Sequence, residues 1–319
     1  MPIGLGLASS HAPGMYVPRD SLKVGVEQLA SRWVERGAAV PPAYARMTTN
    51  DLLDHWDRFR AGHAALRDQI AKYDPEALVF VGGDQTEMFD SSNKANLMVY
   101  TGAESYGWKS PDLMRRVANE QNKITYKTHV ELARWLHHEL VETEGFDAAF
   151  SEEMAPLGKP TTGLPHPFTN INEMFPRADL PVIMIYLNTY DPPAFITAER
   201  CYQLGQAIAR IFSKENRRVA IYGSGGLWHD LGGPMTLWVD EEMDRWFLEQ
   251  IKRGNGQALK NMYSFDSLAV RSGTGENRAW ITVTGAMEEI GSQATVVDYF
   301  PAPETITGIG FAYWTPKKN

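Results

Sequence analysis

The sequence predicts an α/β fold with one central, mostly buried sheet flanked by helices. Short apolar runs of the kind that form strands buried on both faces recur along the chain. Segments with helical periodicity fill the intervals between them, and this alternation favours a sheet with helices on both faces. With 319 residues and 43% hydrophobic content the chain can bury one large core, so we expect residues 1–319 to form a single domain.

The predicted strands are apolar runs bounded by polar or glycine-containing loops. Residues 77–82 read ALVFVG and residues 180–187 read LPVIMIYL, and each run is short enough for a strand buried on both faces. Two further strands are predicted at residues 2–8 and 217–222.

The predicted helices lie in the intervals between and after these strands. In residues 198–213, an apolar stripe runs through Leu204, Ile208 and Ile211, as expected for a helix packed on a sheet. Residues 240–252 begin with the acidic turn DEEMD, which also favours a helix. The other two helices are predicted at residues 50–72 and 126–141.

The composition favours small molecules as partners. The net charge is −8 and the chain has no Lys/Arg block, so we expect neither nucleic acid nor a membrane as a partner. Cys201 is the single cysteine, which excludes an intrachain disulfide and fits a reducing cytoplasm. No export signal or run of about 18 apolar residues is recognisable. We therefore expect a cytoplasmic protein.

Four loops interrupt this pattern at strand ends and carry the polar residues of interest. They read SSHAPG after the first strand, GGDQTEMF after the second, and GSGGLWHDLGGP after the fourth, with a Gly/Pro-rich stretch at 156–170. In open α/β folds, functional groups collect on loops outside the carboxyl ends of strands. We expect these loops to meet at one cleft.

Three histidines lie in these loops, and the other five lie in helical segments. The turn at Pro13 presents His11 at a strand tip, which suits a metal ligand. His229 follows a glycine pair and Trp228, which suits an acid/base residue beside an aromatic wall. His166 is the third loop histidine. Taken singly, a loop histidine is more often a hydrogen-bonded side chain without a catalytic role, but three such loops at one sheet edge weaken that reading.

Glu276 lies in SGTGENRAW, where two glycines lead into a helix or turn. Taken alone, it reads as a first-turn glutamate favoured by the helix dipole. Its distance from Trp280, four residues on, places both on one helix face.

The loop motifs, taken together, resemble the type III extradiol ring-cleavage dioxygenases, the family of the catalytic subunit of protocatechuate 4,5-dioxygenase. The similarity runs nearly end to end, and its strength lies in the order of the pieces rather than in any one of them. The pieces are Ser9-Ser10-His11-x-Pro13, Gly83-Asp84-Gln85, Asn188-Thr189-Tyr190-x-Pro192-Pro193, Arg200-Cys201-x-x-Leu204-Gly205, Gly223-Ser224-Gly225-Gly226-Leu227-x-His229, and Gly275-Glu276-x-x-x-Trp280 with Gly285-Ala286.

The resemblance implies a mononuclear Fe(II) held by two histidines and one glutamate, with open positions for an aromatic substrate and O2. The first histidine matches His11, and the glutamate matches Glu276. The acid/base histidine of the family matches His229, and a further active-site histidine matches His166. Beside them, Trp228 and Tyr190 are candidate substrate-binding walls of an apolar pocket.

One departure from the family pattern concerns the second histidine ligand. Where the family has Asn-Asp-His, this chain has Gly83-Asp84-Gln85. We expect Gln85 to occupy the ligand position, although an amide oxygen binds Fe(II) more weakly than an imidazole does. Otherwise Asp84, Glu87 or a helical histidine such as His63 must substitute, or the metal is lost.

Three functions follow from this resemblance and this departure. The first is an Fe(II)-dependent extradiol dioxygenase that opens a catechol- or aminophenol-type ring, expected as a homo-oligomer. The second is a non-catalytic partner subunit of the same fold. The third is an O2-independent metal-dependent hydrolase or lyase, because one histidine with carboxylate and amide oxygens also suits Zn(II) or Mn(II). The retention of His11, His229 and Glu276 favours the first.

Overall fold

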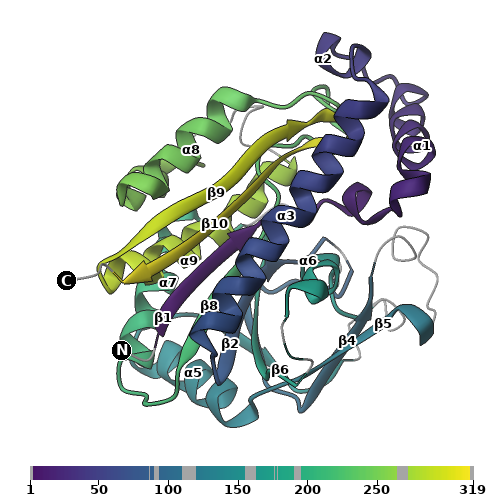
Figure 1. Ribbon diagram of the computed structural model, residues 1–319. Helices are drawn as coiled ribbons and strands as arrows, with labels where there is room; N and C mark the ends of the chain where they lie inside the picture. The colour runs from purple at the N-terminus through teal and green to yellow at the C-terminus, as the bar shows by residue number, and fades with distance from the viewer. Residues whose placement is uncertain are drawn as a thin grey trace.

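The computed structural model describes residues 3–85, 87–89, 93–109, 120–154, 163–175, 177, 179–189, 195–263 and 272–316. Their central feature is an eight-stranded sheet of order β6-β3-β7-β2-β8-β1-β10-β9, with helices on both of its faces (Figure 1). A separate two-stranded sheet joins β4 to β5. The predicted α/β architecture is confirmed.

The middle of the sheet consists of the four predicted strands, which run parallel to one another. Every residue in them is buried, because helices cover both faces. This explains why their sequences are continuously apolar rather than alternating. In spatial order they are β7 (Val182–Leu187), β2 (Ala77–Gly83), β8 (Val219–Ser224) and β1 (Ile3–Ser9).

Both edges of the sheet carry strands that the sequence did not predict. On one side β10 (Thr307–Pro316) pairs antiparallel with β1, and β9 (Ser292–Ala302) pairs antiparallel with β10. On the other side β3 (Leu97–Tyr100) is antiparallel to β7, and β6 (Ala149–Ser151) is parallel to β3. The second sheet pairs β4 (Glu104–Trp108) with β5 (Lys123–Lys127).

Four helices match the predicted segments, with one error at a boundary. The helix predicted from residue 126 begins only at Val130, because KITYK at 123–127 alternates in burial and forms β5. The matching helices are α3 (Thr49–Tyr73), α5 (Val130–Glu142), α7 (Ala198–Phe212) and α8 (Glu241–Arg253). The other helices in the described ranges are α1 (Leu22–Val34), α2 (Pro42–Ala45), α6 (His166–Thr169) and α9 (Asn277–Glu289).

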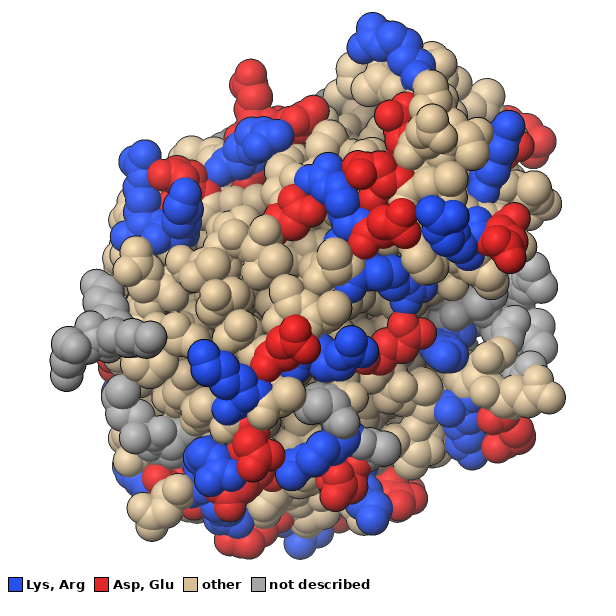
Figure 2. Space-filling model, viewed as in Figure 1, with Lys and Arg blue, Asp and Glu red and all other residues tan. Residues whose placement is uncertain are grey.

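The helices divide the core into two parts. Figure 1 shows α3 crossing one face of the sheet, where Phe59 and Leu66 pack with Leu7 and Phe80. On the opposite face α5, α7, α8 and α9 bury the other large apolar cluster. No helix in the described ranges is both long and apolar enough to cross a bilayer. On the face drawn in Figure 2, acidic and basic side chains are interspersed around a broad uncharged area.

Two glycines allow α7 and α9 to cross closely. A Cβ added at Gly205 would lie 1.9 Å from the Thr282 carbonyl oxygen, and one added at Gly285 would lie 2.1 Å from the Tyr202 carbonyl oxygen. Only glycine permits both approaches. The crossing fixes α9, whose first turn follows directly on Glu276.

Candidate metal centre

The candidate site lies at the carboxyl ends of the parallel strands. His11 follows β1, Gln85 follows β2 and His229 follows β8, and these three strands are neighbours in the sheet. Parallel neighbours end at the same edge, so their loops meet there. His166 begins α6, and Glu276 ends the 3-10 helix η7 (Ser272–Glu276).

Three of the predicted site residues form one buried cluster. One nitrogen from each of His11 and His166 and one carboxylate oxygen of Glu276 all lie within 4.8 Å of one another. The two imidazole rings meet edge to face, with centroids 4.8 Å apart. Each residue is at most 8% exposed. Among the described residues this is the one group of three His, Cys, Asp or Glu side chains placed closely enough to hold an ion.

Hydrogen bonds fix which nitrogen of His11 faces the cluster. The Ser224 hydroxyl donates to the Pro167 carbonyl at 2.7 Å, so its oxygen accepts a bond from His11 Nδ1, which lies 3.0 Å away. Burial lowers the pKa of His11 to about 3, which keeps the ring neutral. His11 Nε2 therefore carries a lone pair, and it lies 3.4 Å from Glu276 Oε2. A lone pair facing a carboxylate is an arrangement that a cation stabilises.

Glu276 is ionised in this setting. Burial alone would raise its pKa, but His11 and His229 outweigh burial and lower the pKa to about 2. Its Oε2 accepts a bond from the Gly226 backbone N–H at 2.6 Å, and its Oε1 accepts one from the Gln85 amide. The carboxylate is thus held from two neighbouring loops.

His166 is oriented by a carboxylate of its own. Its Nδ1 is 2.7 Å from Glu87 Oε1, and its backbone N–H donates to the same oxygen at 3.3 Å. Burial alone would lower the pKa of His166, but Glu87 outweighs it and the net shift is upward. With Nδ1 occupied by Glu87, Nε2 is the nitrogen left for an ion.

His229 lies beside this cluster. Its Nδ1 donates to the Leu227 carbonyl at 2.8 Å, and its Nε2 is 3.7 Å from Glu276 Oε1. Burial lowers the pKa of His229, but Glu276 outweighs it and the net shift is upward. The ring nitrogen Nε2 can therefore take up or release a proton beside the Glu276 carboxylate.

The two predicted pocket walls have different outcomes. Trp228 is buried beside the His229 loop, at 2% exposure. Tyr190 lies outside the described residues. Both roles stay predictions.

The comparison with known families decides the identity of the fold. Residues 39–310 match the family model described as the catalytic LigB subunit of aromatic ring-opening dioxygenase. The chain belongs to this family. The resemblance predicted from the loops is thereby confirmed, and the LigB family implies a metal cofactor.

Curated relatives in the LigB family are distant. A 2,3-dihydroxyphenylpropionate/2,3-dihydroxicinnamic acid 1,2-dioxygenase of Burkholderia vietnamiensis is 26% identical over 176 residues, which cover 41% of this chain and 55% of that protein. The match thus spans about half the length of that relative. The enzyme of the same name from Mycolicibacterium paratuberculosis is 25% identical over 320 residues, covering 84% of this chain and 94% of its own.

A solved structure supports the fold alone. It is an uncharacterized protein from Escherichia coli K12, 14% identical, with a TM-score of 0.50. The similarity covers 78% of this chain and 91% of that one.

Gln85, the residue expected at the second histidine-ligand position, has a defined contact. Gln85 Nε2 donates to Glu276 Oε1, so the atom facing the carboxylate is the amide nitrogen. The prediction that Gln85 binds the metal stays a prediction. Of its possible substitutes, His63 is buried among Phe59 and Phe311, with Nε2 3.4 Å from Ser9 Oγ, and it does not join the cluster.

Sequence reasoning missed Asp244, which supports the His229 loop from α8. It is fully buried, and its carboxylate accepts bonds from the Trp228 backbone N–H at 2.7 Å and the Tyr299 hydroxyl at 3.0 Å. Burial raises its pKa to about 7. A signal was present, because Asp244 shares the buried helix face of Phe247, Leu248 and Ile251, where an unpartnered acid would be costly.

We expect Asp244→Asn to change the pH dependence of stability. The folded-state pKa of about 7 exceeds the ordinary 3.8, so wild type loses stability as pH rises between these values. The asparagine variant lacks this loss, so its free energy of unfolding should rise relative to that of wild type as the pH increases from 3.8 to about 7. Asp244→Ala, which removes the acceptor, should cost about 1–3 kcal/mol. Urea unfolding at pH 5 and pH 8 measures the stability of both variants. If the stability difference between wild type and Asp244→Asn is the same at both pH values, the raised pKa of Asp244 is contradicted.

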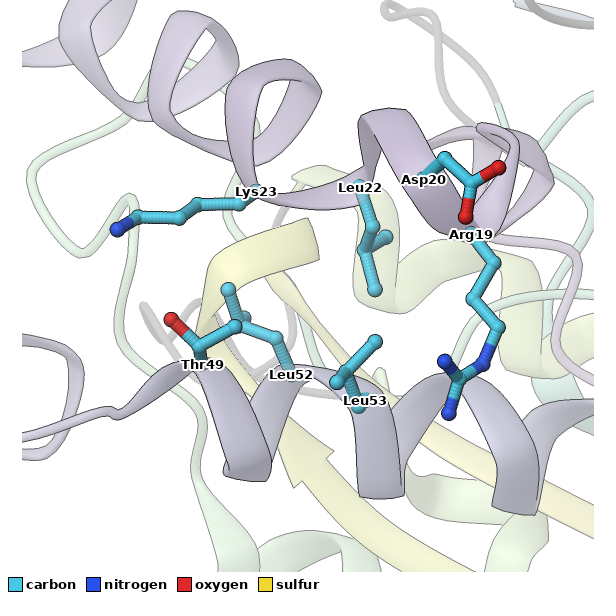
Figure 3. A pocket seen from close by; sticks show the side chains of 7 residues that line it. All are labelled: Arg19, Asp20, Leu22, Lys23, Thr49, Leu52 and Leu53. Carbon is cyan, nitrogen blue, oxygen red and sulfur yellow. The ribbon is translucent and has the colours of Figure 1, made fainter.

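A surface pocket lies elsewhere, between the start of α1 and α3 (Figure 3). Its volume is about 250 Å³, and Leu22, Leu52 and Leu53 project into it. Arg19 at its side is ion-paired with Asp57 at 3.2 Å. None of the predicted site residues lines this pocket, so the buried cluster remains the candidate site.

Proposed function

We propose that this protein is a non-heme Fe(II)-dependent extradiol dioxygenase that opens a catechol- or aminophenol-type ring with O2. The observation that carries the proposal is that His11 and Glu276 face each other in the buried cluster. A neutral His11 Nε2 lies 3.4 Å from an ionised Glu276 oxygen, with His166 close by. Two imidazoles and one carboxylate are the donor set that suits Fe(II) with open positions for substrate and O2.

The residues present fit a divalent ion in charge as well as in donor type. Glu276 and Glu87 are two carboxylates at a cluster whose own histidine ligands are neutral when bound to metal. A dication would balance these two charges inside a site from which solvent is largely excluded. Bound Fe(II) would supply the meeting point at which a chelating diol and O2 exchange electrons.

The remaining chemistry falls to His229. The Leu227 carbonyl holds Nδ1–H, so Nε2 is the atom available to take a substrate hydroxyl proton and later to return it. Glu276, 3.7 Å from that nitrogen, stabilises the imidazolium formed in between. The burial of the surrounding loops limits competing reaction with water.

The curated relatives support an aromatic diol as the substrate, since they are named for dihydroxyphenylpropionate and dihydroxicinnamic acid. We further propose that the protein acts in the cytoplasm, where its single, buried Cys201 would stay reduced. A homo-oligomer and a complex with a related partner subunit both stay predictions.

The test is anaerobic reconstitution with Fe(II), followed by metal analysis and O2 consumption with a panel of catechols and aminophenols. We expect about one iron per chain and substrate-dependent O2 uptake. Bound metal with turnover that needs no O2 would identify a hydrolase or lyase instead. Absence of iron together with a stable complex with an active paralogue would identify a non-catalytic subunit.

A further inference from the structure

The third metal ligand is still to be assigned, because the loop after β2 presents the amide of Gln85 where the resemblance implies a histidine. The Gln85 amide nitrogen donates to Glu276 Oε1, so the side of the amide that faces the carboxylate is the donor. Gln85 is therefore engaged in holding Glu276. The cluster still contains a second imidazole, because His166 lies within 4.8 Å of His11 and Glu276.

The loop that contains Gln85 also carries the group that orients His166. Asp84 accepts bonds from the backbone N–H groups of Glu87 at 3.2 Å, Met88 at 2.7 Å and Phe89 at 3.2 Å. These bonds turn the loop so that the Glu87 carboxylate reaches both the ring Nδ1 and the backbone N–H of His166. Glu87 thereby fixes the tautomer and the ring orientation together.

We propose that His166, oriented by Glu87, is the third protein ligand of the metal and replaces the histidine absent at Gln85. The assignment rests on the proposed function only in requiring a divalent ion at the cluster. In this arrangement the loop after β2 supplies two supporting contacts and no direct ligand. Gln85 holds the carboxylate ligand, and Glu87 holds the imidazole ligand. His166 is then unavailable as a separate proton donor, and His229 is the acid/base residue.

The test measures Co(II) affinity and the visible d–d spectrum of the Co(II) protein, without substrate or O2. We expect Glu87→Gln to weaken Co(II) binding about 10- to 100-fold, as is typical when the group that orients a ligand is changed. His166→Gln should weaken it further and change the spectrum. Glu304→Gln is the matched control, because Glu304 is a buried carboxylate whose Oε1 lies 2.7 Å from Nδ1 of the partly buried His55, outside the cluster.

A gain-of-function variant tests the replacement directly. Gln85→His in the His166→Gln background should recover Co(II) affinity, because it restores an imidazole from the other loop. Should His166→Gln fail to fold, as judged by circular dichroism, Glu87→Gln against Glu304→Gln carries the test. Wild-type affinity and spectrum in both the Glu87 and His166 variants would overturn the assignment.

Failure of the ligand assignment is distinguishable from failure of the proposed activity. Co(II) binding that depends on His166, in a protein that consumes no O2 with any diol or aminophenol, would support the ligand set and overturn the dioxygenase function. Ring cleavage by wild type, with metal binding unaffected by His166→Gln, would support the dioxygenase function and overturn the ligand assignment.

Discussion

Replacing Glu276 with glutamine is expected to abolish tight metal binding and ring cleavage together. The carboxylate is ionised and faces His11 Nε2 at 3.4 Å. Glutamine removes the charge and leaves a neutral amide, which is a weaker ligand for Fe(II). The loss of affinity should exceed the roughly 10- to 100-fold typical of groups outside the metal's own ligands. Metal analysis after anaerobic loading, with O2 uptake on the same sample, measures both.

Glu276→Gln should also change the pH dependence of the protein's stability. The folded-state pKa of Glu276, about 2, is below its ordinary 4.5, so its contribution is full above pH 4.5 and is lost as pH falls towards 2. The metal-free variant should lack this acid dependence. Glu288→Gln is the control, since Glu288 lies on α9 but bonds the Tyr202 hydroxyl at 2.6 Å. Metal content in Glu276→Gln equal to that of this control would contradict the ligand role.

The sequence predicted best the four central strands of the sheet. The four central strands are continuously apolar because both of their faces meet helices, and such runs are recognisable without tertiary information. β9 and β10 were missed. β9 is a half-exposed edge strand that contains Asp298 and Pro301, and its pattern has neither a clean alternation nor a continuous apolar run.

Part of the candidate site was likewise predictable from the sequence, and part was not. His11 and His229 follow predicted strands, so their convergence could be expected from the topology alone. The contact between Glu87 and His166 joins residues 79 positions apart, and no local pattern encodes it. Gly205 and Gly285 appeared in the sequence only as parts of motifs, and the close helix crossing supplies the physical reason for them.

Replacing His229 with asparagine is expected to leave metal binding intact and to slow turnover about 10²- to 10⁴-fold, the usual contribution of a positioned acid/base group. The ring lies beside the metal-ligand cluster, and its Nε2 faces Glu276 Oε1 at 3.7 Å, so removing it takes away a proton acceptor but no ligand. Asparagine cannot take the substrate proton at neutral pH. Turnover should therefore fall while KM changes little.

The pH profile separates this role from a structural one. The pKa of His229 is raised above 6.5 by Glu276, and the ring must be neutral at Nε2 to accept a proton. The wild-type rate should therefore rise with pH through this pKa, and the variant should lack that limb. His138→Asn, at an exposed position on α5, is the matched control and should keep both rate and profile. Loss of bound metal in His229→Asn, or an unchanged kcat, would show that His229 does not act as the acid/base residue.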